Sequence, residues 1–341
     1  MAYTDIDKPS DYFETVTYAG GTTDISSLDF QPDFVWGKKR DGAENHALFD
    51  SVRGATKTIN SNTTALESTR SGSLTSFDSD GFTLGGSDGI ISNSGSTYVA
   101  WSWKAGTAFS NSAGANGADI ASSGSVNTTA GFSIVKWVGN ATDDQQILHG
   151  LSSTVKMIIC KRYIGGSADS WIVYHVGLPV TQYLILNSTS AGLSDNEVIW
   201  SDEHPTSSVF TVGNHGTTND DGSTMIGYCF ADVKSYSKFS SYIGNGNADG
   251  TFVYTGFKPA FIMIKRTDSA ADWEMYDNKR LGFNDDNPPL YANLSNAEGS
   301  NDRIDILSNG FKIRASSGNL GADGGTYIYM AFAENPFVTS T

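Results

Sequence analysis

The sequence predicts an all-β protein made of three repeated antiparallel β-sandwich units. Apolar residues come in short runs bounded by Gly, Asn, Asp and Ser, which is typical of strands joined by turns. Only 17% of the residues are charged, and helix-forming residues keep no sustained period. A set of five phrases also returns three times in the same order, so one structural unit is expected to occur three times.

The clearest repeated phrase is an apolar run that ends in two adjacent cations, at residues 32–39, 155–162 and 259–266. The other four phrases lie at residues 13–20, 47–54, 80–84 and 97–103 in the first copy, at 132–139, 171–177, 208–212 and 224–230 in the second, and at 239–244, 273–279, 309–313 and 326–332 in the third. Three units of about 95 residues each fit a chain that exceeds the usual size of one domain.

The repeats predict a domain organisation with two short ends and one linker. We expect an N-terminal attachment segment at residues 1–12, then β-sandwich repeats at residues 13–106, 131–235 and 236–337. Residues 107–130 are rich in Ala, Ser, Gly and Asn and have little to bury, so we predict a linker there. Residues 338–341 are expected to form a short tail.

Two features of the strand phrases predict how they pack. Tyr327 and Tyr329 alternate with Ile328 and Met330, so both faces of this strand are bulky and should lie between packed layers. The cation pairs should mark the points where buried strands leave for solvent, because exposed cations discourage edge pairing. These pairs are Lys38/Lys39, Lys161/Arg162 and Lys265/Arg266.

Charge and hydropathy exclude several classes of partner. The net charge is -15, so no basic face for nucleic acid is expected. No stretch reaches the roughly 18 apolar residues of a membrane span, and the N-terminus lacks the regions of a signal peptide, so we expect a chain made in the cytoplasm without membrane insertion. The two cysteines, Cys160 and Cys229, lie in apolar runs and are expected to be buried free thiols.

Polar clusters predict no catalytic residue and no required cofactor. The five histidines form no helical metal pair and do not flank a Gly-framed serine. Adjacent carboxylates occur at residues 143–144, 220–221 and 285–286, all in turns that Asp favours for its own backbone hydrogen bonds. Asp220 and Asp221 are the candidate metal ligands, because the oxygen-rich segment 219–223 would suit Ca²⁺.

The tryptophans divide into core residues and candidate ligand-binding residues. Trp36, Trp101, Trp103, Trp171 and Trp273 lie within the repeated strand phrases, where we expect core packing. Trp137 and Trp200 lie nearer to loops. Because aromatic faces suit the apolar patches of sugars, these two are the candidate ligand-binding residues.

Several phrases together resemble an uncharacterised repeat family found in virion proteins of tailed phages, especially those of marine bacteria. They lie at residues 3–13, 30–36, 50–54, 77–82 and 99–106. The resemblance extends over nearly the whole chain and is strongest in residues 3–106 and 256–337. The second repeat departs from the pattern, with Ser-Thr-Val at residues 153–155 where the others have Pro. Members are commonly labelled tail fibre or structural protein, with lectin-like or jelly-roll-like β-sandwiches.

The resemblance implies a non-enzymatic virion structural protein, which we expect to be a tail-fibre or tail-tip component that contacts host-surface glycans. Its expected partners are other virion proteins of the tail or capsid, and several copies or a homo-oligomer are expected because multivalency strengthens weak binding. Three alternatives remain open: a capsid decoration protein or head fibre, a polysaccharide depolymerase, and structural glue between virion parts.

Overall fold

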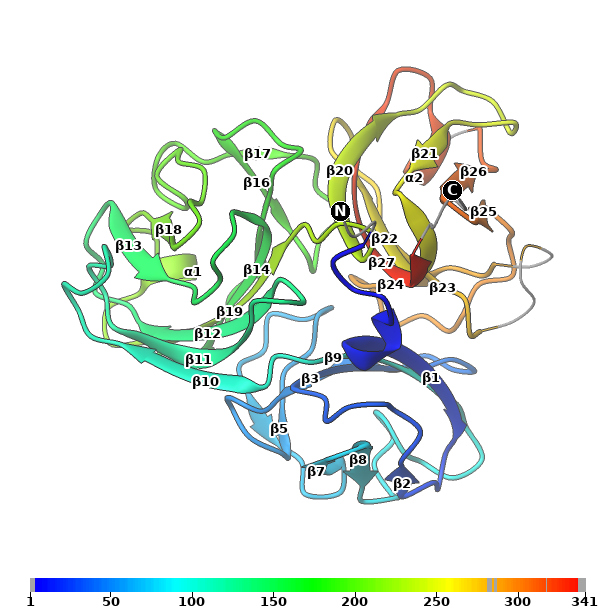
Figure 1. Cartoon of the computed structure of the whole chain (residues 1–341), viewed down its shortest axis with the longest axis horizontal. Helices are drawn as coiled ribbons and strands as arrows, with labels where there is room; N and C mark the ends of the chain where they lie inside the picture. The colour runs from blue at the N-terminus through cyan, green and yellow to red at the C-terminus, as the bar shows by residue number, and fades with distance from the viewer. Residues whose placement is uncertain (1–3, 281–283, 285–286, 317, 337–341) are drawn as a thin grey trace.

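A computed structural model describes residues 4–280, 284, 287–316 and 318–336. The fold is all-β with antiparallel pairing between its strands, which confirms the predicted fold class at that level. Figure 1 shows three lobes around a common centre, one for each sequence repeat. Within the described residues the helices are η1 (Pro9–Asp11), α1 (Gly216–Asn219) and α2 (Gly318–Gly321). No helix in this part of the chain is long and apolar enough to cross a membrane.

The first repeat forms a large sheet and a small sheet. The large sheet has the order β1 (Phe13–Ala19), β9 (Thr97–Trp103), β3 (Phe34–Lys39) and β4 (Ala47–Asp50). The small sheet has the order β2 (Asp24–Ile25), β8 (Gly81–Leu84) and β7 (Leu74–Asp78). A separate short pair joins β5 (Lys57–Thr58) to β6 (Ser68–Thr69).

The second repeat has the longest sheet. Its order is β10 (Thr107–Asn111), β11 (Ser122–Asn127), β12 (Phe132–Val138), β19 (Thr224–Ala231), β14 (Val155–Ile164), β15 (Ile172–His175), β16 (Gln182–Ile185) and β17 (Leu193–Ser194). The small sheet pairs β13 (Gln145–Leu148) with β18 (Val209–Val212).

The third repeat, like the first, has one large sheet and one small three-stranded sheet. Its large sheet has the order β20 (Ser237–Ile243), β27 (Thr326–Pro336), β22 (Phe257–Arg266), β23 (Trp273–Asp277) and β24 (Leu290–Tyr291). Its small sheet has the order β21 (Phe252–Tyr254), β26 (Gly310–Ile313) and β25 (Ile304–Leu307). In each large sheet the last long strand of the repeat (β9, β19 or β27) lies between the first long strand (β1, β12 or β20) and the strand that carries the cation pair (β3, β14 or β22). The repeated phrases therefore occupy equivalent positions.

Each large sheet is buried on both faces, as the bulky alternation predicts. In β27, Tyr327 and Tyr329 pack into a cluster with the small sheet of the third repeat, whereas Ile328 and Met330 point into a different cluster. The first and second repeats have equivalent outer clusters between their large and small sheets. The strands therefore separate two apolar layers, which explains why both of their faces are bulky.

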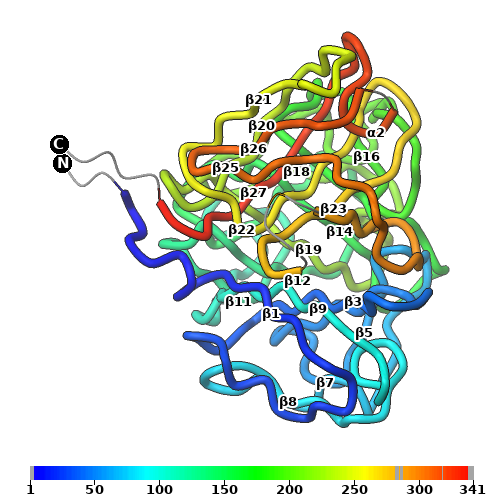
Figure 2. The backbone as a smooth tube through the Cα atoms, turned by 90° about the vertical axis from the view of Figure 1, so that its right-hand side faces the viewer, coloured from blue at the N-terminus to red at the C-terminus, as the bar shows by residue number. Residues whose placement is uncertain are grey.

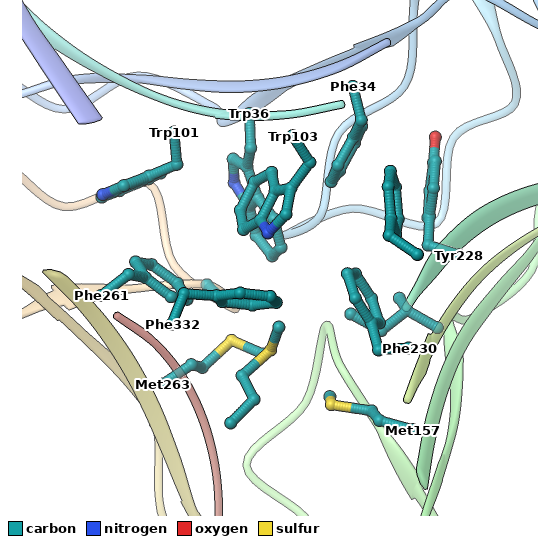
Figure 3. Packing of buried hydrophobic residues seen from close by; sticks show 14 of the residues in the cluster. Phe34, Trp36, Trp101, Trp103, Met157, Tyr228, Phe230, Phe261, Met263 and Phe332 are labelled. Atoms are coloured by element: carbon teal, nitrogen blue, oxygen red, sulfur yellow. The ribbon is translucent and has the colours of Figure 1, made fainter. Parts of the chain in front are cut away.

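The inner faces of all three large sheets share one hydrophobic core. This shared core contains Phe34 and Trp103 from the first repeat, Phe230 from the second, and Phe261 and Phe332 from the third. Figure 3 shows these side chains converging from three directions. Their rings are in direct contact, with Trp103 lying 5.8 Å from Phe261 and 5.6 Å from Phe332 between ring centroids. No repeat therefore completes its inner layer alone.

Residues 107–130 are not a free linker, so that prediction is wrong. They contain β10 and β11, which extend the large sheet of the second repeat through pairing with β12. Ile120 also bridges to Ile147 in the small sheet. The composition was misleading because small polar residues on an outer sheet edge satisfy backbone pairing with few apolar side chains, and Ala118, Ile120 and Val126 supply the burial.

The described part of the predicted N-terminal segment, residues 4–12, belongs to the folded body. Ile6 is buried in the shared core, and the ring of Tyr12 lies 6.1 Å from that of Tyr236 in an edge-to-face contact. The segment η1 also lies beside β27, so the described N- and C-terminal segments approach each other on one side of the molecule (Figure 2). The expected tail at residues 338–341 lies outside the described residues.

A cycle of hydrogen bonds joins each repeat to the next around the shared core. The first cation of each pair, Lys38, Lys161 or Lys265, is fully buried, so the prediction that it marks an exit to solvent is wrong. Each ammonium donates to a backbone carbonyl of another repeat, at Ser295 (3.3 Å), Thr64 (2.7 Å) and Thr189 (3.0 Å) in that order. The first repeat thus contacts the third, the second contacts the first, and the third contacts the second.

A second set of contacts follows the same cycle. The indoles of Trp171 and Trp273 donate to the carbonyls of Asn60 and Ile185 at 2.9 and 3.0 Å. In the first repeat His46 takes this position, and its Nε2 lies 2.9 Å from the carbonyl of Tyr291. Because Nδ1 of His46 accepts from the Trp36 indole, Nε2 carries the proton and donates.

A third contact of the cycle uses buried carboxylates. Asp50 accepts a hydrogen bond from the Tyr228 hydroxyl at 2.7 Å, and Asp277 accepts one from the Trp101 indole at 3.0 Å. Each carboxylate also pairs with the arginine three residues on, which balances its charge inside the protein. These bonds again cross between repeats.

The second repeat has His175 where the others have an aspartate. Its Nδ1 accepts from the backbone N–H of Gly177 at 2.9 Å, so Nε2 donates to the carbonyl of Tyr329 at 3.1 Å. Burial lowers the pKa of His175 to about 4, which keeps the ring neutral at pH 7. At this position Asp50 and Asp277 accept a hydrogen bond from the neighbouring repeat, whereas His175 donates one. His175 must donate because the Tyr329 carbonyl can only accept.

Truncating a ring of the shared core should destabilise the whole chain. Phe261→Ala is expected to lower the free energy of unfolding by about 3–5 kcal/mol, because it removes a buried ring and leaves a cavity. The matched control is Phe252→Ala in the same repeat, where the side chain is 44% exposed and the loss should stay within about 0.5 kcal/mol. Denaturant unfolding measures both values. Equal losses would contradict the assigned core.

Acid should weaken the fold partly through His175. Its folded pKa lies below the value of an exposed histidine, so between pH 6.5 and about 4 the unfolded chain binds a proton that the folded chain does not. Stability is therefore lost as pH falls through this window. In His175→Gln the slope of unfolding free energy against pH should be shallower by up to about 1.4 kcal/mol per pH unit. An unchanged slope between pH 4 and 6.5 would count against a neutral buried histidine.

Candidate functional site

The two tryptophans predicted to bind a ligand are core residues. Trp137 and Trp200 are only 1% and 2% exposed and pack in the outer cluster of the second repeat with Phe210. The Trp137 indole donates to the carbonyl of Thr218 at 3.1 Å. Neither ring has an open face for a sugar, so the structure corrects this prediction. Proximity to a loop in the sequence did not predict an exposed ring, because β12 and the segment before β18 turn these rings inward.

The candidate metal ligands are engaged by protein groups or by solvent. The Asp220 carboxylate lies 3.0 Å from a guanidinium nitrogen of Arg162 and accepts from the Ser223 hydroxyl at 2.5 Å. Asp221 is exposed. The described residues contain no group of three or more His, Cys, Asp or Glu side chains placed to hold a metal ion. A cation at Asp220 would have to displace Arg162.

The remaining polar candidates have structural positions. Asp143 and Asp144 are exposed in a turn, and residues 285–286 lie outside the described residues. Cys160 and Cys229 are buried free thiols on the neighbouring strands β14 and β19, as predicted. Burial raises the pKa of both thiols, so they stay protonated and unreactive.

A pocket lies at the junction between the second and third repeats, which form neighbouring lobes in Figure 1. Its volume is about 430 Å³, within the range of small-molecule sites, which often lie between domains. The second repeat contributes Gly177, Pro179 and Gln182 to its wall. The third contributes the end of β20, the turn after β22 and the start of β27, with residues Ser241, Tyr242, Ile243, Thr267, Asp268, Thr326 and Tyr327.

The charged group of the pocket is held rigidly. Asp268 accepts from Nε and Nη2 of Arg266 at 2.9 and 3.0 Å, and it also accepts from the backbone N–H of Thr326 at 3.1 Å. Hydrogen bonding to Arg266 lowers the pKa of Asp268, so the carboxylate is ionised and paired at neutral pH. The hydroxyls of Thr267 and Thr326 lie 2.7 Å apart beside it.

Two other polar side chains face the pocket without a protein partner. Among the described residues, nothing hydrogen-bonds to the side-chain amide of Gln182 or to the hydroxyl of Ser241. The pocket wall also includes Ile243, whose side chain is 63% exposed. Tyr242 and Tyr327 also border the pocket, but their rings turn into the outer cluster of the third repeat, where they stack with centroids 4.8 Å apart.

One glycine of the pocket wall differs from its counterparts in the other repeats. Gly177 lies two residues after His175, and the equivalent positions in the other repeats are Val52 and Lys279. The side chain of Val52 packs against the shared core. A Cβ on Gly177 would lie 3.0 Å from Ile328 and 3.3 Å from Ser241, so glycine lets the third repeat approach the second closely at this point.

A second surface feature is an exposed aromatic pair on β21. Phe252 and Tyr254 are 44% and 58% exposed and point to the same side of an edge strand, since Val253 between them is buried. The paired strands place Asp24 in the first repeat and Gln146 in the second at the position of Phe252. This aromatic pair is therefore specific to the third repeat.

Neither feature was found from the sequence. The pocket joins residues about 60 to 150 positions apart, and its glycine resembles any turn glycine. Comparing the aligned repeats at each position could have found Gly177 and Phe252, because both differ from their counterparts in side-chain size.

Calcium should neither bind nor stabilise the loop at Asp220. Adding Ca²⁺ is expected to leave the melting temperature unchanged, because Arg162 already neutralises this carboxylate. Asp220→Asn should cost about 1 kcal/mol with or without Ca²⁺, since the pair is partly exposed. The control Asp221→Asn alters an exposed side chain and should cost little. A calcium-dependent rise in melting temperature that Asp220→Asn abolishes would restore the metal-site prediction.

Comparison with known proteins gives one match. The model of a family described as a domain of unknown function (DUF7483) matches residues 8–336. No curated protein and no solved structure shows a significant match. Since the family model spans nearly all of the described fold, including the pocket, the chain belongs to the DUF7483 family.

Proposed function

We propose that this protein is a non-catalytic structural component of a tailed-phage virion, at the tail fibre or tail tip, that attaches to the host surface. The observation that carries the proposal is that repeated and unrepeated residues have different places in the fold. The repeated phrases build the shared core and its hydrogen-bond cycle, whereas the connecting segments that are not repeated add Pro179, Gln182, Thr267 and Asp268 to the pocket and form the outer turns. Binding residues on a rigid scaffold are expected at such variable positions.

The resemblance of the strand phrases to virion repeat proteins supports the particle context. The architecture supports it too: we propose that the chain is three copies of a two-sheet, lectin-like sandwich fused around one core. Such a body resists local opening because each repeat is needed to cover the inner faces of the others. We propose that several copies per particle act together, so that a weak site gains strength by multivalency.

The chemistry of the pocket favours binding over cleavage. Glycoside hydrolysis uses two carboxyl groups, one as acid and one as base or nucleophile. The carboxylate of Asp268 is instead fixed by both donors of Arg266 and by the Thr326 N–H. A group held in this way keeps its charge and is poorly placed to transfer a proton, so we disfavour the depolymerase alternative.

One observation favours a capsid or tail docking role as a second candidate function. The exposed Phe252 and Tyr254 lie on an uncovered edge strand of the third repeat. Exposed aromatic residues are enriched at protein interfaces. We propose this face as a contact with another virion protein, and it serves a head fibre or decoration protein as well as a tail component.

Labelling of intact phage particles tests the proposed function. Antibody raised against the purified protein should mark the tail tip in electron micrographs, and the purified protein should bind host cells. Label on the head alone would replace the tail proposal with the capsid alternative. Absence of label from intact and disrupted particles would contradict a virion role altogether.

A further inference from the structure

We infer that the pocket between the second and third repeats binds a neutral saccharide. This inference rests on the proposed attachment function and names the ligand class of that site. Four features of the pocket support it: its unpaired polar groups, its charge balance, its exposed aliphatic residue and the residues that distinguish this junction from the others.

The unpaired polar groups match the needs of a polyhydroxylated ligand. The Gln182 amide can donate and accept, and so can the hydroxyls of Ser241, Thr267 and Thr326. Sugar hydroxyls also do both, so each can find a partner on a wall of this kind. Because neither Gln182 nor Ser241 has a side-chain partner in the described part of the chain, binding a sugar breaks no bond seen there at these two side chains.

The charge balance selects against ionic ligands. Asp268 and Arg266 form a bidentate pair whose charges cancel, so the site offers no net charge to an anion or a cation. The chain as a whole has a net charge of -15, which repels anions at long range. A neutral ligand meets no such barrier, and the oxygen atoms of Asp268 remain able to accept from adjacent hydroxyls.

The apolar part of the wall fits the C–H face of a sugar ring. Ile243 is the most exposed of the large apolar side chains in the described residues. The stacked rings of Tyr242 and Tyr327 have their hydroxyls bonded inside the protein, to the carbonyls of Leu320 and Gly318 at 2.9 Å in both cases. These rings are packed in the outer cluster of the third repeat, so Ile243 is the residue that offers an apolar contact to the ligand.

The site is specific to this junction. Gly177 allows a close approach of Ile328 and Ser241, whereas the equivalent positions in the other repeats carry the larger Val52 and Lys279. At the position of Ser241 the first repeat has Thr17 and the second has Lys136. Thr and Lys thus already occur at this strand position in the other two repeats. Ser241→Thr and Ser241→Lys are therefore compatible with the backbone of the strand.

Titration with defined sugars tests the inference. Glucose, galactose, mannose and N-acetylglucosamine are added in turn to the full-length protein, with binding followed by saturation-transfer and amide-shift NMR. At least one should bind with a millimolar Kd and shift the amides of Ser241, Asp268 and Thr326. Ser241→Lys should weaken that binding by more than about tenfold because its side chain fills the pocket. Gln182→Leu should weaken it similarly through the loss of the amide.

Ser241→Thr is the matched control and should bind within about twofold of the original protein. Equal melting temperatures of the variants show that the fold is kept. The inference is overturned if none of the four sugars binds, or if Ser241→Lys and Gln182→Leu both bind as well as the original. Host-cell binding that survives Ser241→Lys would leave the attachment function standing and place the receptor site elsewhere.

Discussion

The packing of three inner sheet faces into one aromatic core is the constraint on which the rest of the structure depends. Phe34, Trp103, Phe230, Phe261 and Phe332 come from three repeats and close a layer that no repeat could close alone. Around this core each repeat donates hydrogen bonds to backbone carbonyls of the next. Non-directional burial thus supplies the driving force, and the directional bonds fix how the repeats are rotated relative to one another.

The buried lysines show why polar groups were retained inside this assembly. Burial lowers the pKa values of Lys38, Lys161 and Lys265 to about 8, which still leaves each ammonium charged near neutral pH. Each ammonium is solvated by backbone carbonyls in place of water. A buried cation is tolerated only where such partners are provided, so each ammonium depends on the carbonyl that the neighbouring repeat supplies.

The sequence was sufficient to predict the all-β class, the strand phrases and the burial of Trp36, Trp101 and Trp273, because alternation and spacing are local signals. It failed where the outcome depended on another repeat. Lys161 looked like a surface cation because its carbonyl partner Thr64 lies 97 residues away. The pocket was invisible for the same reason, since Gln182 and Ser241 meet only across a junction. Residues 107–130 looked like a linker for a different reason, because their small polar residues gain stability from backbone pairing with β12 of the same repeat, which composition does not show.

Calorimetry tests the central claim most directly. Because the repeats share one core and one cycle of hydrogen bonds, the full chain should unfold in a single transition whose calorimetric and van't Hoff enthalpies agree. Independent sandwiches would unfold in separate steps, with a van't Hoff enthalpy well below the calorimetric value. Two or three resolved transitions would contradict the shared core as the basis of the fold.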